Sequence, residues 1–142
     1  GLQGKVAIVT GASKGIGYCT ALQLVKEGVR VTICARGEKS LQVAAASIKK
    51  ETGIDVHTIS ADMTKEEDCK EVINQTVEKY GRLDILINNA GVAAANSFEQ
   101  VSSELWQTDL DLKLFGAVNC SKYAVPHLKK VGGGSIVNVT AV

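Results

Sequence analysis

The sequence predicts a doubly wound α/β fold, in which helices cover both faces of a parallel sheet. Short apolar runs alternate with segments of helical periodicity five times along the 142 residues. Parallel strands require crossovers of this kind, and such crossovers are right-handed. Apolar residues make up 45% of the chain but aromatic residues only 4%, so the core must be aliphatic, which suits buried parallel strands. The length is enough for one domain, which we expect to comprise residues 1–142.

The first half of the chain repeats a unit of strand, helix and glycine. Residues 5–10 form a mostly apolar run, which is too short for a helix and predicts a buried strand. Residues 15–27 follow with helical spacing, and Gly28 is expected to end that helix, as glycine does just beyond a helix C-terminus. The next expected elements are a strand at 31–35, a helix at 40–50 closed by Gly53, and a strand at 55–60.

The second half continues the alternation with longer helices. Thr64 and Glu67 have the spacing of a capping box, which predicts a helix that begins at Thr64 and stops at Gly81. Proline lacks a backbone N–H and disturbs a helix interior. The elements expected after Gly81 are a strand at 84–87, a helix capped by Ser102 or Ser103 that extends to about Lys130 with a kink or local break at Pro126, and a strand at 135–140.

The composition excludes several classes of function. Sixteen basic residues face fifteen acidic ones, so no net field would attract nucleic acid or an anionic membrane. The longest apolar run, near residues 85–95, is far shorter than the roughly 20 residues of a membrane helix. His57 and His127 lack the spacing of a metal site. We therefore expect a cytoplasmic protein whose four cysteines, which form no CxxC pair, are buried free thiols: Cys19, Cys34, Cys69 and Cys120.

A glycine-rich segment, Thr10–Gly17, joins the first strand to the first helix. Gly11 permits a sharp turn, Gly15 leaves space for phosphate groups, and Gly17 lets the helix pack close to the sheet. Backbone N–H groups and the positive end of the helix dipole would then face a pyrophosphate. The alternative is a tight turn that binds nothing, but the strand–turn–helix context favours a nucleotide.

Two motifs make this pattern more specific. Thr10–Gly17 resembles the TGxxxGxG signature of the short-chain dehydrogenase/reductase family, and residues 88–91 resemble its NNAG motif at the end of the fourth strand. Residues 4–11 and 134–139 are also similar to family segments, so the resemblance covers essentially the whole chain. It implies a Rossmann-type sheet that holds a nicotinamide cofactor. The residues assigned to cofactor binding are Gly11, Ser13, Lys14, Gly15, Ile16, Gly17, Arg36, Asp62, Met63, Asn89, Ala90 and Gly91.

The resemblance also gives roles to residues at two strand ends. It implies that Asp62 hydrogen-bonds the adenine amino group and that the backbone of Met63 contacts the ring. It implies that residues 89–91 line the adenosine ribose, whereas Asn88 is a candidate for bracing the central strand. A plainer alternative for Asp62 is a charge at a helix N-terminus near Thr64. Its position at the carboxyl end of a strand favours a ligand contact, because ligands of open α/β sheets bind there.

Two basic residues indicate which nicotinamide cofactor is bound. Arg36 lies 19 residues after Gly17, where NAD-binding folds usually place an acidic residue against the ribose 2′-hydroxyl. A guanidinium there can instead pair with the 2′-phosphate of NADP(H). Lys14 adds a second cation, and the resemblance associates a basic residue in that place with NADP. The alternative is that both are ordinary solvated charges, but their joint placement predicts NADP(H).

The catalytic residues of the family are not found at their usual places. The resemblance implies a Tyr and a Lys in a YxxxK motif, an Asn and a Ser. Lys113 stands at the usual Asn position and Ala141 at the Ser position, while the sequence ends at Val142 before a YxxxK. The catalytic residues are therefore unknown. The chain is the N-terminal part either of a divergent enzyme or of a family member that has lost catalysis. Lys113 is a candidate cation beside the nicotinamide, an acid if it is buried, or a solvated side chain.

These observations lead to one main functional hypothesis and two alternatives. The main one is an NADP(H)-dependent oxidoreductase that transfers a hydride between nicotinamide and a carbonyl or secondary alcohol, with chemistry that requires residues beyond Val142. The first alternative is a non-catalytic NADP(H)-binding sensor or scaffold. A methyltransferase that uses S-adenosylmethionine is weaker, because it would favour an acidic residue in place of Arg36 and leaves residues 88–91 unexplained.

The long helix predicts how the protein assembles. It carries two apolar sides, and a helix of this kind needs two neighbours. The resemblance implies a subunit interface there, so we expect a homodimer or homotetramer. The alternative is that a further part of the same chain covers the second side. One apolar stripe consists of Leu110, Leu114, Ala117, Val118, Ser121, Ala124, Val125 and Leu128, and a second side of Leu112, Phe115 and Tyr123.

Overall fold

A computed structural model describes residues 1–91 and 97–140. It contains a five-stranded sheet in the order β3-β2-β1-β4-β5, in which all neighbouring strands are parallel. The strand order reverses between β1 and β4, as it does in doubly wound folds, so the predicted fold class is confirmed. The strands are β1 (Val6–Thr10), β2 (Arg30–Ala35), β3 (His57–Ser60), β4 (Ile85–Asn88) and β5 (Ser135–Asn138).

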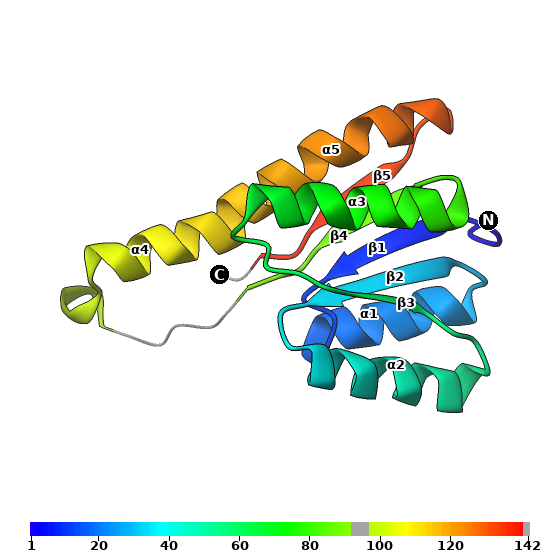
Figure 1. Ribbon diagram of the computed structural model, residues 1–142, viewed down its shortest axis with the longest axis horizontal. Coiled ribbons are helices and arrows are strands. Elements are labelled where there is room, and N and C mark those ends of the chain that lie inside the picture. The colour runs from blue at the N-terminus through cyan, green and yellow to red at the C-terminus, as the bar shows by residue number, and fades with distance from the viewer. Residues whose placement is uncertain (92–96, 141–142) are drawn as a thin grey trace.

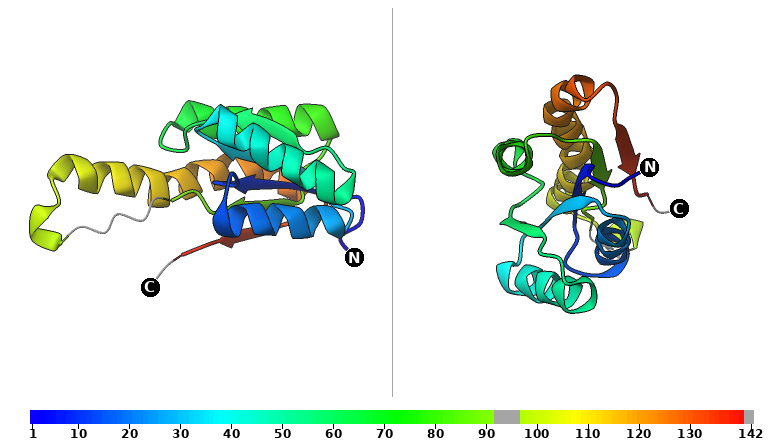
Figure 2. Two further views of the ribbon diagram at one scale, coloured as in Figure 1. Left: turned by 90° about the horizontal axis from the view of Figure 1, so that it is seen from below. Right: turned by 90° about the vertical axis from the view of Figure 1, so that its right-hand side faces the viewer.

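Helices cover both faces of this sheet. The α-helices are α1 (Gly15–Lys26), α2 (Glu38–Thr52), α3 (Glu66–Tyr80), α4 (Ser103–Leu110) and α5 (Gly116–Lys130). In Figure 1, α3 and α5 lie above the strands, and α1 and α2 lie below them. A 3-10 turn, η1 (Phe98–Gln100), precedes α4, and a π-helical segment, η2 (Asp111–Phe115), joins α4 to α5. Elements α4, η2 and α5 form a long rod, and its α4 end extends past the carboxyl ends of the strands (Figure 2).

Strand β1 divides the core into two layers, because its residues alternate between the two faces. Val6 and Ile8 face α3 and α5, whereas Ala7 and Val9 face α1 and α2, and all four are completely buried. The two layers are aliphatic, as the composition predicts. Among the described residues, no helix is long and apolar enough to cross a membrane.

The predicted helix ends are correct where glycine or serine marks them. Gly53 and Gly81 cap α2 and α3 in the left-handed conformation, with φ of 74° and 79°. Ser102 caps α4, and its hydroxyl oxygen accepts a hydrogen bond of 3.2 Å from the Leu105 backbone N–H. Strands β3 and β5 are shorter than the expected 55–60 and 135–140.

The prediction of a capping box at Thr64 and Glu67 is wrong. Helix α3 begins at Glu66, with Lys65 at its N-cap. The Thr64 hydroxyl donates instead to Asp62 Oδ1 at 2.7 Å, and the Thr64 backbone N–H donates to the same oxygen at 2.9 Å. The Asp62 side chain thus forms a local turn that competes with a helical start at Thr64.

Of the kink or local break expected near Pro126, the break is wrong. Helix α5 continues through Pro126, and the interruption of the α-helical pattern lies at Asp111–Phe115 instead. Ala124 and Leu128, on either side of the proline, are buried against the core. We attribute the continuity to this packing, which holds both flanking turns in place although one N–H group is missing.

The long helix buries only part of the predicted stripe, Ala124 and Leu128. Leu110, Leu114 and Val118 are 43%, 51% and 49% exposed. A Cβ on Gly116 would lie 2.9 Å from the Met63 carbonyl oxygen, so a glycine is required for the close approach of α5 to this turn. A row of small residues is a weak hydrophobic signal, although it allows close packing. The buried row of α5 is Gly116, Cys120, Ala124 and Leu128.

The cysteines are free thiols, as expected, but one of them is not buried. Cys34, Cys69 and Cys120 lie in the core, whereas Cys19 is exposed on α1. The buried residues of α1 are Gly17, Ala21, Leu22 and Val25, so Cys19 lies on the other side of that helix.

Candidate nucleotide-binding site

The turn between β1 and α1 packs tightly against the end of β4. Gly11 has a φ of 61°, and a Cβ on it would lie 2.9 Å from the Ala90 Cα. A Cβ on Gly17 would overlap the Gly11 carbonyl oxygen and lie 2.5 Å from Asn89 Nδ2. Glycine is therefore required at both positions, as the sequence predicted for a sharp turn and a close helix.

Gly15 differs from these two glycines because it faces open space. Its φ is also 61°, but a Cβ on it would meet no atom of the described chain within 4 Å. Helix α1 begins at Gly15, has no acidic residue in its first turn, and receives no capping hydrogen bond from the side chain of Lys14. The N–H groups and positive dipole end of α1 are thus left for an anion. Lys14 and Ile16 are exposed beside this opening, and Ser13 is half-buried.

A hydroxyl that we did not assign to the site connects the two motifs. Thr10 Oγ1 accepts hydrogen bonds of 3.0 Å from the backbone N–H groups of both Asn89 and Ala90, and donates to the Ile87 carbonyl at 3.4 Å. Asn89 Nδ2 donates to the Gly11 carbonyl at 3.1 Å. The ends of β1 and β4 are therefore held together at the point where the strand order reverses, which is where ligands of open α/β sheets bind. Thr10 is the first residue of the glycine motif, so the motif itself could have indicated a role for this hydroxyl.

Asp62 and Arg36 follow neighbouring strands, β3 and β2, at the same edge of the sheet. Arg36 is exposed, and its backbone carbonyl accepts a hydrogen bond of 3.0 Å from the Ser60 hydroxyl. Burial alone would raise the pKa of Asp62, but the hydrogen bonds from Thr64 and the charges of Arg36 and Lys65 bring it below its ordinary value. Asp62 is therefore ionised at neutral pH and can accept a further hydrogen bond.

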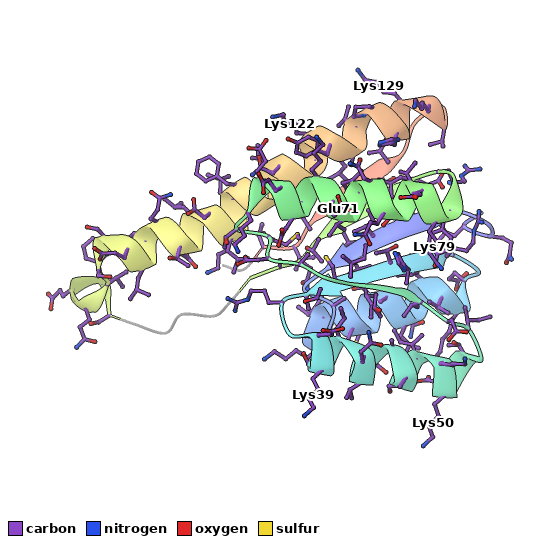
Figure 3. The ribbon with its side chains drawn as sticks, in the orientation of Figure 1. Lys39, Lys50, Glu71, Lys79, Lys122 and Lys129 are labelled. Atoms are coloured by element: carbon purple, nitrogen blue, oxygen red, sulfur yellow. The ribbon has the colours of Figure 1, made fainter. Side chains whose placement is uncertain are left out.

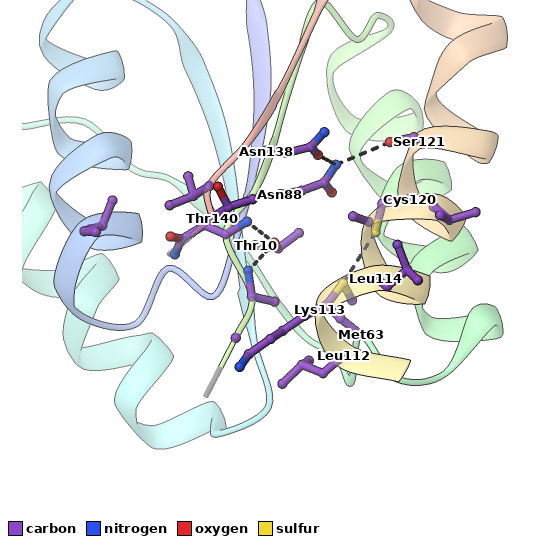
Figure 4. Close-up of a pocket in the computed structure, with 18 residues that line it drawn as sticks. Thr10, Met63, Asn88, Leu112, Lys113, Leu114, Cys120, Ser121, Asn138 and Thr140 are labelled. Carbon is purple, nitrogen blue, oxygen red and sulfur yellow. Dashed lines mark hydrogen bonds between the residues drawn. The ribbon is translucent and has the colours of Figure 1, made fainter. Parts of the chain in front are cut away.

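Met63 and residues 89–91 border a pocket of about 920 Å³ at this edge (Figure 4). The Met63 side chain is buried in the core, so any contact of Met63 with a ligand must involve its backbone or the thioether at the pocket wall. Asn88 braces strands, as suggested. Its Nδ2 donates to Asn138 Oδ1 at 2.9 Å and to Ser121 Oγ at 3.3 Å, which joins β4 to β5 and α5. Nothing in the sequence predicted Ser121 or Asn138.

Lys113 lies in the π-helical segment and lines the same pocket. Its ammonium forms an ion pair of 2.9 Å with Asp109, one turn earlier, and its side chain is half-exposed. The burial that an acid role would require is therefore not observed. A Cβ on Gly91 would lie 3.8 Å from both Cγ and Cε of Lys113, so the alkyl chain extends over the glycine. Figure 4 shows the ammonium directed toward the end of β4.

The structure thus brings the predicted residues to one edge of the sheet. Those in the pocket wall are Ile16, Met63, Asn89, Ala90, Gly91 and Lys113, and the others follow the carboxyl ends of β1, β2 and β3. Ala141 lies outside the described residues. Within the described chain, no group of three or more His, Cys, Asp or Glu residues is placed to hold a metal ion.

These features fit a nicotinamide dinucleotide. The two tightly packed glycines form the floor of the turn, and Gly15 with the free end of α1 leaves space and N–H donors for a pyrophosphate. An ionised carboxylate and an exposed guanidinium stand farther along the same edge.

Known proteins share this arrangement. The sequence matches the short chain dehydrogenase family over residues 5–142. It is 37% identical over 135 residues to 11-beta-hydroxysteroid dehydrogenase A of Sesamum indicum, covering 94% of this chain and 39% of that protein. It is 35% identical over 138 residues to the 3-oxoacyl-[acyl-carrier-protein] reductase FabG of Staphylococcus epidermidis, covering 97% and 57%. The chain spans about half the length of the curated relatives it matches.

Solved structures agree with this relationship. The L-sorbose reductase of Gluconobacter frateurii, complexed with NADPH and L-sorbose, superimposes with a TM-score of 0.90 at 34% identity, over 96% of this chain and 52% of that one. An NAD+-bound xylitol dehydrogenase gives a TM-score of 0.88 at 30% identity, over 95% and 52%. The two neighbours carry different cofactors, so the likeness alone does not decide between NADP and NAD. The sequence match and the shared fold together establish that this chain belongs to the short-chain dehydrogenase family.

Proposed function

We propose that this protein is an NADP(H)-dependent oxidoreductase that transfers a hydride between nicotinamide and a carbonyl or secondary alcohol. In this proposal residues 1–142 are one nucleotide-binding domain, and the chemistry requires further residues. The observation that carries the cofactor assignment is the pair of exposed cations, Lys14 and Arg36, at the glycine turn and the end of β2. The free thiols are compatible with a reducing compartment such as the cytoplasm.

Arg36 is the residue that should select the phosphorylated cofactor. It stands where an acidic residue would repel the 2′-phosphate, and a guanidinium can form two parallel hydrogen bonds with that group. Lys14 supplies a second positive charge beside the start of α1. NADPH is therefore expected to bind more tightly than NADH.

The test is calorimetric binding of NADPH and NADH to the purified protein and to Arg36→Ala. Because hydrogen bonds to charged groups contribute about 1.5–3 kcal/mol, NADPH affinity should fall roughly 10- to 100-fold in the variant, while NADH affinity changes little. Lys50→Ala is the matched control. Lys50 is an exposed cation near the C-terminal end of α2, and Lys39 lies at the opposite end, where the helix begins (Figure 3). Equal affinities of the wild type for both cofactors, or binding of neither, would contradict the proposal.

The relatives' names limit the substrate to a broad class. They are a 3-oxoacyl reductase, a hydroxysteroid dehydrogenase and a sorbose reductase. Each acts on a carbonyl or hydroxyl group, and we propose no finer class for this protein. The pocket provides the hydroxyl group of Ser121 and the amide group of Asn138 along its wall, which suit a polar substrate or the cofactor amide.

Lys113 is our candidate for a cation beside the reacting carbonyl. Its position over Gly91 and its ion pair with Asp109 place an ammonium in the pocket wall without burying it. Replacement by alanine should lower kcat by about 10-fold or more, while NADPH affinity remains near the wild-type value. Lys122→Ala is the control, because Lys122 is exposed on α5 and pairs with Glu66. Unchanged turnover in Lys113→Ala would assign Lys113 to the solvated surface.

A non-catalytic NADP(H)-binding sensor or scaffold is the second candidate. Lys113 at the usual Asn position and Ala141 at the usual Ser position favour it. The two candidates differ in one measurement, which is the oxidation of NADPH by the purified protein in the presence of a panel of ketones and aldehydes. Selective NADPH binding without turnover on any of them would favour the sensor.

We also propose that the protein is a homodimer or homotetramer. The rod of α4, η2 and α5 exposes Trp106, Leu114 and Phe115, each about half accessible in the described chain. Light scattering of the purified protein should give a mass of two or four protomers, and a mass of one protomer would favour coverage of this surface by another part of the same chain.

A further inference from the structure

Three sulfur atoms meet in the core behind the pocket. The Met63 thioether sulfur lies 3.5 Å from Cys120 Sγ and 4.0 Å from Cys69 Sγ. All three residues are at least 95% buried. They come from three elements, since Met63 follows β3, Cys69 lies in α3 and Cys120 lies in α5. The proposed function uses neither thiol.

The close packing of α3 on α5 places both thiols against the same Met63 sulfur. Cys69 Sγ is 3.6 Å from the Met63 carbonyl oxygen and 4.0 Å from the Gly116 carbonyl oxygen. Gly116 is one turn before Cys120 on the buried row of α5, and its missing side chain permits this approach. The two sulfurs therefore lie in one layer between the helices.

The pocket gives this layer a route to solvent. Met63 and Cys120 both belong to the wall of the pocket of about 920 Å³, and Figure 4 shows their sulfur atoms facing one another across its floor. A small polar oxidant in the pocket would meet these two side chains first, and it would reach the completely buried Cys69 once the Met63 side chain moves aside.

The thiols are not equivalent, and the difference favours reaction at one of them. A hydrogen bond with the Cys120 thiol lowers the pKa of Cys69, whereas the same bond together with burial raises the pKa of Cys120. Burial raises the pKa of Cys34, the third buried thiol, to about 12. Cys69 is thus the thiol most readily converted to a nucleophilic thiolate.

We propose that Cys69 and Cys120 form a dithiol modification site, which a hydroperoxide oxidises to a disulfide that joins α3 to α5. The Cys69 thiolate attacks the O–O bond of hydrogen peroxide, which gives a sulfenic acid on Cys69 and releases one water after protonation. The Cys120 sulfur then displaces the sulfenic hydroxyl as a second water and forms the S–S bond. Two thiol protons and two electrons pass to the peroxide, so the step needs no further reductant or oxidant.

The Met63 side chain must move for this bond to form. A disulfide sulfur pair is about 2.05 Å apart, so the thiols rotate toward one another and the thioether that contacts both is displaced. Methionine has three rotatable bonds and adapts to such changes. Met63 is also next to Asp62 at the end of β3, so the oxidised protein should have an altered turn at that edge of the sheet.

The test is a peptide map of the purified protein after mild peroxide treatment, alkylation of the remaining thiols and non-reducing trypsin digestion. A Cys19→Ser background removes the exposed thiol that would link separate molecules. We expect a linked pair of peptides, residues 66–70 with 114–122, with a mass about 2 Da below the sum of the two, abolished by dithiothreitol. Alkylation of Cys69 and Cys120 should be lost in parallel.

Two variants give the controls. Cys120→Ala should abolish the linked pair and leave a sulfenic acid that dimedone captures on Cys69, whereas Cys34→Ala, a buried thiol outside the pair, should leave the link intact. If Cys69 and Cys120 remain fully alkylated while Met63 is converted to its sulfoxide, the proposal is overturned. It is also overturned if either thiol links to Cys34 instead. The wild-type map decides these outcomes even if a variant fails to fold.

Discussion

The centre of the sheet and its β5 edge differ in how completely the described chain covers them. Strand β1, at the centre, is buried along its whole length, and the turn after it is held by Thr10 and Asn89. Strand β5, at the edge, exposes three of its four residues, including Val137 at 47%. The rod of α4, η2 and α5 beside it exposes further large apolar side chains, such as Leu114 and Phe115.

This difference suggests that cofactor binding and catalysis depend on different regions of the molecule. The cofactor edge, at the ends of β1, β2, β3 and β4, has its supporting contacts within the described residues. The pocket beside α5 and β5 has one wall of packed residues and an apolar surface that a soluble protein normally covers. Cofactor binding is therefore predicted to depend on the first region alone, and catalysis on the second region together with whatever covers it.

The largest effect is expected from two identical substitutions, one in each region. Leu86→Ala in β4 removes a completely buried side chain and should cost about 2–5 kcal/mol of unfolding free energy. Leu114→Ala removes a side chain that is 51% exposed and should change it by less than about 0.5 kcal/mol. Urea unfolding followed by circular dichroism measures both. A loss above about 2 kcal/mol for Leu114→Ala would indicate that another surface covers the rod.

A smaller effect is expected at Thr10, which ties the two motifs together. Thr10→Val keeps the shape but leaves the partly buried N–H groups of Asn89 and Ala90 without their acceptor. Such a change costs about 2 kcal/mol, and NADPH affinity should fall with it. Thr108→Val is the control, because the Thr108 hydroxyl donates only to the Glu104 carbonyl on an exposed turn. Equal stability of Thr10→Val and wild type would show that the Thr10 hydroxyl does not stabilise the site.

The comparison also explains what the sequence could predict. The predictions of the glycine turn and of the end of β2 were correct because these conformations depend on the local sequence. Gly11, for example, adopts a φ of 61°, which glycine favours. The bonds from Asn88 to Ser121 and Asn138 join residues 33 and 50 positions apart, and no local pattern encodes them. Gly116 and Cys120 of the buried row of α5 were missed because they are small, whereas hydrophobic periodicity favours large side chains such as Leu114, which is exposed.

Asp84 offers a pH test at the edge of the sheet opposite the cofactor site, where β1 and β4 begin. Burial alone would raise its pKa, but hydrogen bonds from Arg82 and the Val6 backbone N–H bring it below the ordinary value. Its ionised form therefore stabilises the fold above the unfolded pKa of about 3.9, and this contribution is lost as pH falls through the folded pKa. Asp84→Asn should cost about 1 kcal/mol at pH 7, and the difference should shrink below about pH 4. A constant difference between pH 7 and pH 3 would contradict this assignment.

The smallest effect is expected at Glu66, which connects α3 to α5 on the surface. Its carboxylate accepts hydrogen bonds from the Tyr123 hydroxyl at 2.7 Å and from the Lys122 ammonium at 3.1 Å, which lower its pKa. Because the group is exposed, Glu66→Gln should lower the thermal midpoint only slightly, and the difference should vanish near 1 M NaCl, where charges are screened within about 3 Å. A large, salt-independent loss would mean that the α3–α5 contact is buried in the assembled protein, as an interface along the rod requires.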